Sequence, residues 1–394
     1  MDARGCSDQN AGMKRPLAET HPQKFKTTMS RRHAVSLVLA ALSAGLLRNG
    51  FAASNREAMQ AAAQLIQKHV DAGTIESAVL HVRHGGEKIE RAFGKAAAAD
   101  APFLLGSITK TMTAAAAMVL VDRGELRLSD PVMKFIPEFS EGARKDVTIA
   151  HLLTHTSGLP DQLEENNALR SRHAPLADFV RGTVRTPLLF APGTKYHYQS
   201  MGILLAAEII GRITKMPLPD FLAAQIFKPL GMTRSALGPG TFKPAELIRV
   251  QTEHAAPEAG AGAANAKDWD WNSAYWRALG APWGGAHCSA EDVATFLHSF
   301  MHPDGRALRE ETARLMIRNH TEGLGARRGI GFALGPDGFG KGCSARSFGH
   351  SGSTGMLAWA EPESDTICVI LTSLPSSMSG PLVLHPVSDV IAAK

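Results

Sequence analysis

The chain has 394 residues, of which 44% are hydrophobic and 20% charged, so it can bury one large core or two smaller ones. This composition excludes a disordered protein, a collagen-like rod and a small disulfide-stabilised scaffold. The net charge of +5 lies entirely in residues 1–52, and residues 53–394 are neutral. A neutral body without a basic face argues against binding to nucleic acid or anionic lipid.

Residues 29–52 have the pattern of a secretory signal peptide. Arg31 and Arg32 precede an apolar run over 34–47, and small residues follow it. This run is too short to span a bilayer, so we expect an exported protein, periplasmic or secreted, without stable membrane insertion. The arginine pair also opens a twin-arginine signature. The true start of the chain, Met1 or Met29, stays open.

The next segments predict a helix and a hairpin. Ser54 and Glu57 form a capping box, and apolar residues follow at helical spacing until Gly73. Strands are predicted over 78–84 and 87–94, because only a Gly-Gly pair separates these two runs.

Helical periodicity dominates residues 107–230, and a capped helix begins at Ser289. Residues 253–268, rich in Ala and Gly, are expected to form a long loop. Four short strands and a weak terminal helix are predicted over 329–335, 346–350, 356–361, 366–372 and 380–393.

Strands at both ends with helices between them predict an α/β (α+β) fold, with one sheet built from both termini. The absence of strict βαβ alternation argues against a doubly wound parallel sheet. We expect a leader and signal peptide over 1–52, a sheet domain from 53–125 plus 284–394, and an inserted, mostly helical domain over 126–283.

The sequence indicates neither a disulfide framework nor a metal centre. Three cysteines follow the leader, and Cys368 lies in an apolar run typical of a buried, inert thiol. His151 and His155 are four residues apart, but the Glu of a zinc-protease motif is missing, so we expect packing and capping roles. We therefore expect no metal and no organic cofactor.

Ser107 and Lys110 are the first candidates for catalysis. They are three residues apart and share one face of a predicted helix whose N-terminus favours developing negative charge. A serine hydroxyl needs a base to become a nucleophile, and a lysine can serve if its surroundings let it become neutral. The Ser-x-x-Lys pattern alone also fits an ordinary capped helix.

Two further segments carry suitable chemistry. Tyr198 follows a Pro-Gly turn, and its phenol could relay a proton near a cation or simply pack as a buried aromatic. Residues 348–355 form a Gly-rich strand edge, which lets a substrate approach the backbone and offers an N–H as an oxyanion donor.

Together these three elements resemble the class C β-lactamase-like serine hydrolases. This family comprises penicillin-binding-protein relatives that include D-Ala-D-Ala carboxypeptidases, D-aminopeptidases and family VIII carboxylesterases. The resemblance covers about residues 55–375, and it includes connecting segments in the family's order at 121–131, 152–159 and 227–232. It implies an antiparallel sheet flanked by helices, as in β-lactamases and transpeptidases.

The resemblance also implies roles for single residues. Ser107 would be the nucleophile, Lys110 its proton acceptor and Tyr198 the second member of the acid/base pair. The backbone N–H groups of Ser107 and Ser353 would form the oxyanion hole. The candidate substrate-binding residues are Ser200, His350, Ser351, Gly352 and Trp283.

Two positions depart from the family's pattern. The family's Lys-Thr-Gly is here His-Ser-Gly (350–352), and its Tyr-x-Asn is Tyr-Gln-Ser (198–200). Histidine is mostly neutral at pH 7, so it is a weaker cation than lysine for binding a substrate carboxylate. A serine side chain has a single donor, whereas an Asn side chain can both donate to and accept from a substrate amide. Both changes favour esters over β-lactams and acyl-D-Ala peptides.

Two other patterns have alternative interpretations. Residues 349–353 imitate the G-x-S-x-G elbow, with Asp365 and His385 in α/β-hydrolase order, but the fifth residue is Ser and no parallel βαβ run precedes it. A group of tryptophans either packs in the core or walls an apolar acyl pocket. Its members are Trp269, Trp271, Trp276 and Trp283.

We therefore expect an exported serine hydrolase that works through an acyl-enzyme, with small esters as substrates. The alternative within this class is a β-lactamase, a D-Ala-D-Ala carboxypeptidase or a D-aminopeptidase-type hydrolase. The alternative outside it is a non-catalytic penicillin-fold binding protein. The expected partner is a small-molecule ester or amide, not nucleic acid, and the sequence does not indicate an oligomeric state.

Overall fold

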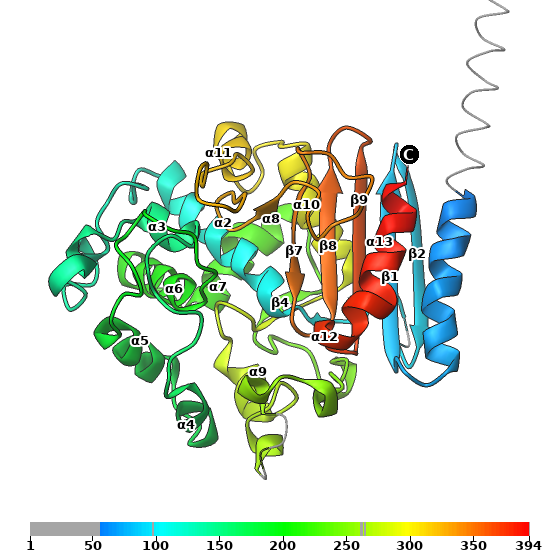
Figure 1. Cartoon of the computed structure of the whole chain (residues 1–394), viewed down its shortest axis with the longest axis horizontal. Coiled ribbons are helices and arrows are strands. Elements are labelled where there is room, and N and C mark those ends of the chain that lie inside the picture. The colour runs from blue at the N-terminus through cyan, green and yellow to red at the C-terminus, as the bar shows by residue number, and fades with distance from the viewer. Residues whose placement is uncertain (1–55, 97, 261–262, 264, 394) are drawn as a thin grey trace, which may run out of the picture. The chain divides into compact units, whose positions relative to one another are not determined.

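The computed structural model describes residues 56–96, 98–260, 263 and 265–393 (Figure 1). The predicted signal peptide, the leader over 1–52 and the capping residue Ser54 lie outside the described residues. The chain from Arg56 onward forms one compact unit, and the proposed division into a sheet domain and a helical domain stays a prediction.

Six strands form one antiparallel sheet, to which both ends of the described chain contribute (Figure 1). Their order is β2-β1-β9-β8-β7-β6. The strands are β1 (Ser77–His84), β2 (Glu87–Gly94), β6 (Ala333–Leu334), β7 (Phe348–Gly352), β8 (Met356–Glu361) and β9 (Thr366–Thr372). β1 pairs with β2 through the hairpin and with β9 from the far end of the chain, so the expected fold class is confirmed.

The predicted strand over 329–335 is only partly formed. The strand β6 retains two residues of it, Ala333 and Leu334. Gly331 has a φ of +81°, a left-handed conformation that interrupts an extended strand. Of the predicted strand over 329–335, only residues 333–334 are therefore paired as a strand.

A second, smaller sheet has the order β3-β5-β4. Its strands are β3 (Phe103–Leu104), β4 (Ser235–Leu237) and β5 (Ala286–Cys288). Strands of two or three residues show no alternation, so the sequence did not predict them. The backbone N–H of Leu105 donates to Ala286 O at 2.8 Å, which fixes the chain just before Ser107.

Helices cover both faces of the large sheet (Figure 1). One face packs against the helix over 56–71 and α13 around Trp359. The other face packs against α10, and the buried side chains of α2 belong to the same larger core. The labelled helices are α2 (Thr109–Asp122), α3 (Ile149–Leu153), α4 (Asn166–Ser171), α5 (Leu176–Arg185), α6 (Met201–Thr214), α7 (Leu218–Leu222), α8 (Lys228–Leu230), α9 (Ala274–Leu279), α10 (Ala290–Met301), α11 (Glu310–Met316), α12 (Ser376–Ser379) and α13 (His385–Ala392).

Two local predictions are confirmed at the residues named. Ser289 caps α10, because its hydroxyl accepts from the backbone N–H of Asp292 at 3.2 Å. Cys368 is fully buried and free, and burial raises the pKa of its thiol. Across the described segments, no helix has both the length and the apolar character needed to cross a bilayer.

Candidate active site

Ser107 lies at the start of the buried helix α2, in a short 3-10 turn (Gly106–Ile108) that continues from β3. Gly106 has a φ of +54° and lies against the end of β7. A Cβ on Gly106 would stand 2.9 Å from Thr354 Oγ1 and 3.1 Å from the backbone nitrogen of Ser353. Glycine therefore allows this turn to approach the Gly-rich strand edge, which brings Ser107 and Ser353 to one place.

The Lys110 ammonium donates to Ser107 Oγ at 2.9 Å and to the carbonyl oxygen of Trp283 at 3.1 Å. The side chain is 1% exposed, because α2 is buried along nearly its whole length. In the described part of the chain, no carboxylate forms an ion pair with Lys110. A lysine shielded from water and held against a hydroxyl is placed to exchange a proton with it.

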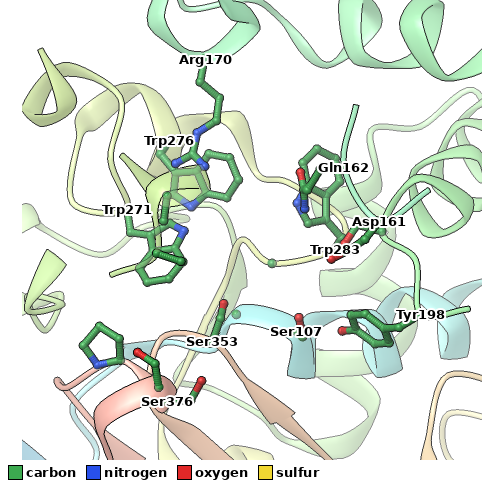
Figure 2. Close-up of a pocket in the computed structure, with 17 residues that line it drawn as sticks. Ser107, Asp161, Gln162, Arg170, Tyr198, Trp271, Trp276, Trp283, Ser353 and Ser376 are labelled. Carbon is green, nitrogen blue, oxygen red and sulfur yellow. Dashed lines mark hydrogen bonds between the residues drawn. The ribbon is translucent and has the colours of Figure 1, made fainter. Parts of the chain in front are cut away.

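Tyr198 lies next to this pair. Lys110 Nζ is 4.8 Å from the centroid of the Tyr198 ring, and Figure 2 shows the tyrosine hydroxyl pointing toward Ser107. Two histidines also lie near the Tyr198 ring, with centroid distances of 4.8 Å to His155 and 5.9 Å to His350. The structure thus brings the three predicted catalytic residues together.

Both histidines beside Tyr198 are fully buried, which keeps them neutral. Burial, followed by the charge of Arg328, lowers the pKa of His350 to about 3. Burial also holds the pKa of His155 well below its ordinary value, and the charges of Arg328 and Lys110 act in the same direction. Protonating either ring would place another positive charge beside Lys110, so the site excludes it at neutral pH.

A pocket of about 300 Å³ opens in front of Ser107 (Figure 2). Ser353 lines it together with Ser107, and Ser353 O accepts from the backbone N–H of Ser376 at 3.0 Å. The oxyanion hole formed by the N–H groups of Ser107 and Ser353 stays a prediction. Three of the four clustered tryptophans, Trp271, Trp276 and Trp283, line this pocket, so they favour the acyl-pocket interpretation over pure core packing.

The other predicted substrate-binding residues have varied positions. Ser200 lines the pocket, where its hydroxyl donates to Asp161 Oδ1 at 2.6 Å. His350, Ser351 and Gly352 lie on β7 beside the pocket but are not among the residues that line it. His350 Nδ1 instead donates to Ser351 O at 2.6 Å, with the imidazole packed against Tyr198.

Several residues that line the pocket were not predicted from the sequence. Asp161 and Gln162 line the pocket and follow closely after the connecting segment 152–159. The carboxylate of Asp161 beside that segment was the only feature of the sequence that could have indicated their place in the pocket. Arg170 comes from α4 and carries no local signal; its guanidinium lies 4.0 Å from the ring centroid of Trp276.

The competing interpretations of other motifs find no support in the geometry. Ser351 lies within strand β7 rather than at a strand-to-helix turn, and Asp365 contacts His302 at 2.6 Å. His151 accepts through Nδ1 from the backbone N–H of Thr148, as a capping residue. Within the described ranges, no group of three or more His, Cys, Asp or Glu side chains is placed to hold a metal ion.

The fold is similar to that of several solved structures. It resembles EstCE1, described as a hydrolase with promiscuous acyltransferase activity, with a TM-score of 0.71, 22% identity and coverage of 86% of this chain and 99% of that chain. It also resembles the D-amino acid amidase from Ochrobactrum anthropi SV3, with a TM-score of 0.65, 22% identity and coverage of 84% and 97%. At these identities the likeness concerns the fold.

Sequence comparison gives a more similar relative and a family. Esterase EstB from Burkholderia gladioli is 36% identical over 158 residues, which cover 36% of this chain. The matched part of the chain spans only 40% of the length of EstB. The sequence model of the beta-lactamase family matches residues 62–387, so the chain belongs to the beta-lactamase family, as its motifs led us to expect.

Proposed function

We propose that the protein is a serine hydrolase that forms an acyl-enzyme on Ser107 and that its substrates are small carboxylic esters. The observation that carries this proposal is the 2.9 Å hydrogen bond from Lys110 Nζ to Ser107 Oγ at the edge of the pocket, with Tyr198 beside both. Membership of the beta-lactamase family supports the reaction class.

The proposed reaction has two halves. Lys110 in its neutral form accepts the proton of Ser107 as Oγ bonds to the ester carbonyl carbon, and the N–H groups of Ser107 and Ser353 stabilise the resulting oxyanion. The Tyr198 hydroxyl passes a proton to the departing alcohol oxygen as its bond to carbon breaks. The Tyr198 phenolate then takes a proton from a water molecule whose oxygen bonds to the acyl carbon. As the bond from that carbon to Ser107 Oγ breaks, the Lys110 ammonium returns its proton to Oγ, which releases the carboxylic acid and restores all three side chains.

Three observations support esters over β-lactams and acyl-D-Ala peptides. His350 is neutral and lies off the pocket lining, so it offers no fixed cation to a substrate carboxylate. The single donor of Ser200 is already used by Asp161, so it is not free for a substrate amide oxygen. The relative with 36% identity is an esterase.

The test compares the protein with its Ser107→Ala variant. We expect the protein to hydrolyse p-nitrophenyl butyrate faster than nitrocefin or an acyl-D-Ala-D-Ala peptide, and the variant to lose this turnover while keeping its circular dichroism spectrum. A fluorophosphonate probe should label the protein and not the variant. Unlabelled protein would indicate a non-catalytic binding protein, and faster nitrocefin turnover would indicate a β-lactamase.

We also propose that the protein is exported to the periplasm or secreted, on the basis of the sequence pattern over 29–52. The test is N-terminal sequencing of the protein recovered from cell fractions. An N-terminus near residue 53 in the exported fraction is expected, and an unprocessed chain confined to the cytoplasm would contradict export.

A further inference from the structure

The pocket contains a carboxylate that the proposed reaction does not use. Asp161 lines the pocket together with Ser107 and is held at two points by Ser200. The Ser200 hydroxyl donates to Asp161 Oδ1 at 2.6 Å, and the Ser200 backbone N–H donates to Asp161 O at 3.3 Å. The first bond holds one oxygen of the carboxylate, and the second holds the backbone from which the side chain extends.

In the described part of the chain, Asp161 forms no ion pair with a lysine, arginine or histidine side chain. The cation of the same pocket is engaged elsewhere: Arg170 stacks on Trp276 and donates to Trp269 O at 3.0 Å. In Figure 2, Asp161 lies on the Tyr198 side of the pocket and Arg170 on the Trp276 side. A negative charge in a partly enclosed pocket favours a ligand that supplies the missing positive charge.

Aromatic rings surround the same space. Trp283 and Tyr198 line the pocket beside Asp161, and Trp271 and Trp276 continue the wall. Aromatic faces attract ammonium groups through their negative electrostatic face, so a carboxylate with several rings forms a favourable site for such a cation. A purely apolar acyl chain would instead leave the carboxylate desolvated and unpaired.

We infer that Asp161, positioned by Ser200, is a subsite for a cationic ammonium group of the substrate, so that amino-substituted esters are preferred over neutral ones. This inference rests on the proposed function, because it concerns the substrate of the same Ser107 site. It assigns to Ser200 a positioning role through Asp161, in addition to its place on the pocket lining.

The test uses two p-nitrophenyl esters of equal shape. One carries a γ-trimethylammonio group on its butyryl chain, and in the other a quaternary carbon replaces the nitrogen. A second pair with one methylene fewer places the charge closer to the ester carbonyl. We expect kcat/KM to be about tenfold or more higher for a cationic ester than for its neutral partner, the usual range for a partly buried charge interaction.

The Asp161→Asn variant keeps an oxygen acceptor for Ser200 but loses the charge. Its ratio of cationic to neutral kcat/KM should fall toward one, and Ser200→Ala should lower the ratio in part. Glu164→Gln removes an exposed carboxylate three residues away and should retain the original ratio.

An equal or lower kcat/KM for both cationic esters, or an unchanged ratio in Asp161→Asn, would overturn the subsite. Failure of the proposed function looks different, because neither member of a pair would then be hydrolysed and Ser107 would not be labelled by the fluorophosphonate. Differential scanning fluorimetry of each variant confirms that the compared proteins are folded.

Discussion

His155 holds the chain on both sides of Tyr198. Its Nδ1 accepts from the backbone N–H of Gln199 at 3.3 Å, and its carbonyl oxygen accepts from the backbone N–H of His197 at 2.9 Å. His155 itself has a φ of +63°, a left-handed conformation that costs a residue with a side chain about 1 kcal/mol or more. This strained conformation occurs at a buried residue whose hydrogen bonds hold the backbone on both sides of Tyr198, the proposed acid/base residue.

Two replacements of His155 separate the effect of its backbone strain from its effect on the position of Tyr198. Asn tolerates the left-handed conformation and keeps an oxygen acceptor near Nδ1, so His155→Asn should retain most of the esterase kcat. His155→Gly relieves the strain but removes the acceptor, and we expect kcat to fall about tenfold with little change in KM, from the loss of about one hydrogen bond. Steady-state kinetics and thermal melting of both variants test this, and equal kcat values in the two would contradict the positioning role.

If Lys110 acts as a proton acceptor, a positive charge at this position is not sufficient for catalysis. Lys110→Met fills the buried space without a base, and Lys110→Arg keeps a permanent cation that cannot accept a proton. Both variants should lose about 100-fold or more in kcat, the usual contribution of a general base. If Lys110→Arg retained the kcat of the unmodified protein, Lys110 would act as a cation and the proposed proton transfer would be wrong.

Tyr198→Phe tests the hydroxyl without disturbing the ring, which packs beside His155 and Lys110. We expect the melting temperature to change little and kcat to fall about 100-fold, because the leaving alcohol loses its proton donor. Tyr196 provides the matched control, since it lies two residues away and does not line the pocket. The Arg328 guanidinium lies over both rings, 5.2 Å from the centroid of Tyr196 and 5.4 Å from that of Tyr198. A similar loss of kcat in Tyr196→Phe and Tyr198→Phe would argue against a specific role for the Tyr198 hydroxyl.

Local patterns were sufficient to predict the framework of the large sheet and the proximity of Ser107 and Lys110. The hairpin of β1 and β2 was predicted nearly to the residue, because alternation and a Gly-Gly turn are local signals. Ser107 and Lys110 are related by helix geometry alone, and their hydrogen bond follows from that spacing. The position of Tyr198 came from a family resemblance, since no local rule relates two residues so far apart in the sequence.

The rest of the site depends on tertiary packing. Arg170 reaches the pocket from α4 and Asp161 from a loop, and neither segment has a periodicity that indicates a binding surface. The strands β3, β4 and β5 are too short to show alternation, although they fix the start of α2. The strand assignment around His350 was close, but only packing shows that its imidazole faces Tyr198.

The buried imidazole of His350 predicts a specific loss of stability in acid. Its pKa is lowered from 6.5 to about 3 in the folded protein, chiefly by burial. Between these values the unfolded chain binds a proton that the folded protein does not, so the free energy of unfolding decreases as the pH falls below 6.5. For one such group the slope is about 1.4 kcal/mol per pH unit.

His350→Gln removes this proton, so its free energy of unfolding should decrease less steeply between pH 6 and pH 4 than that of the unmodified protein, by about 1.4 kcal/mol per pH unit. Urea unfolding at several pH values measures the two slopes. Their difference cancels the contributions that both proteins share, from the carboxylates and from other buried histidines such as His155 and His287, whose pKa values burial also lowers. His254→Gln, at an exposed histidine, serves as the control and should retain the original slope. If His350→Gln retained the original slope as well, the His350 imidazole would take up its proton equally in the folded and unfolded states. The imidazole would then not be buried in solution, and its burial could not keep additional charge away from Tyr198.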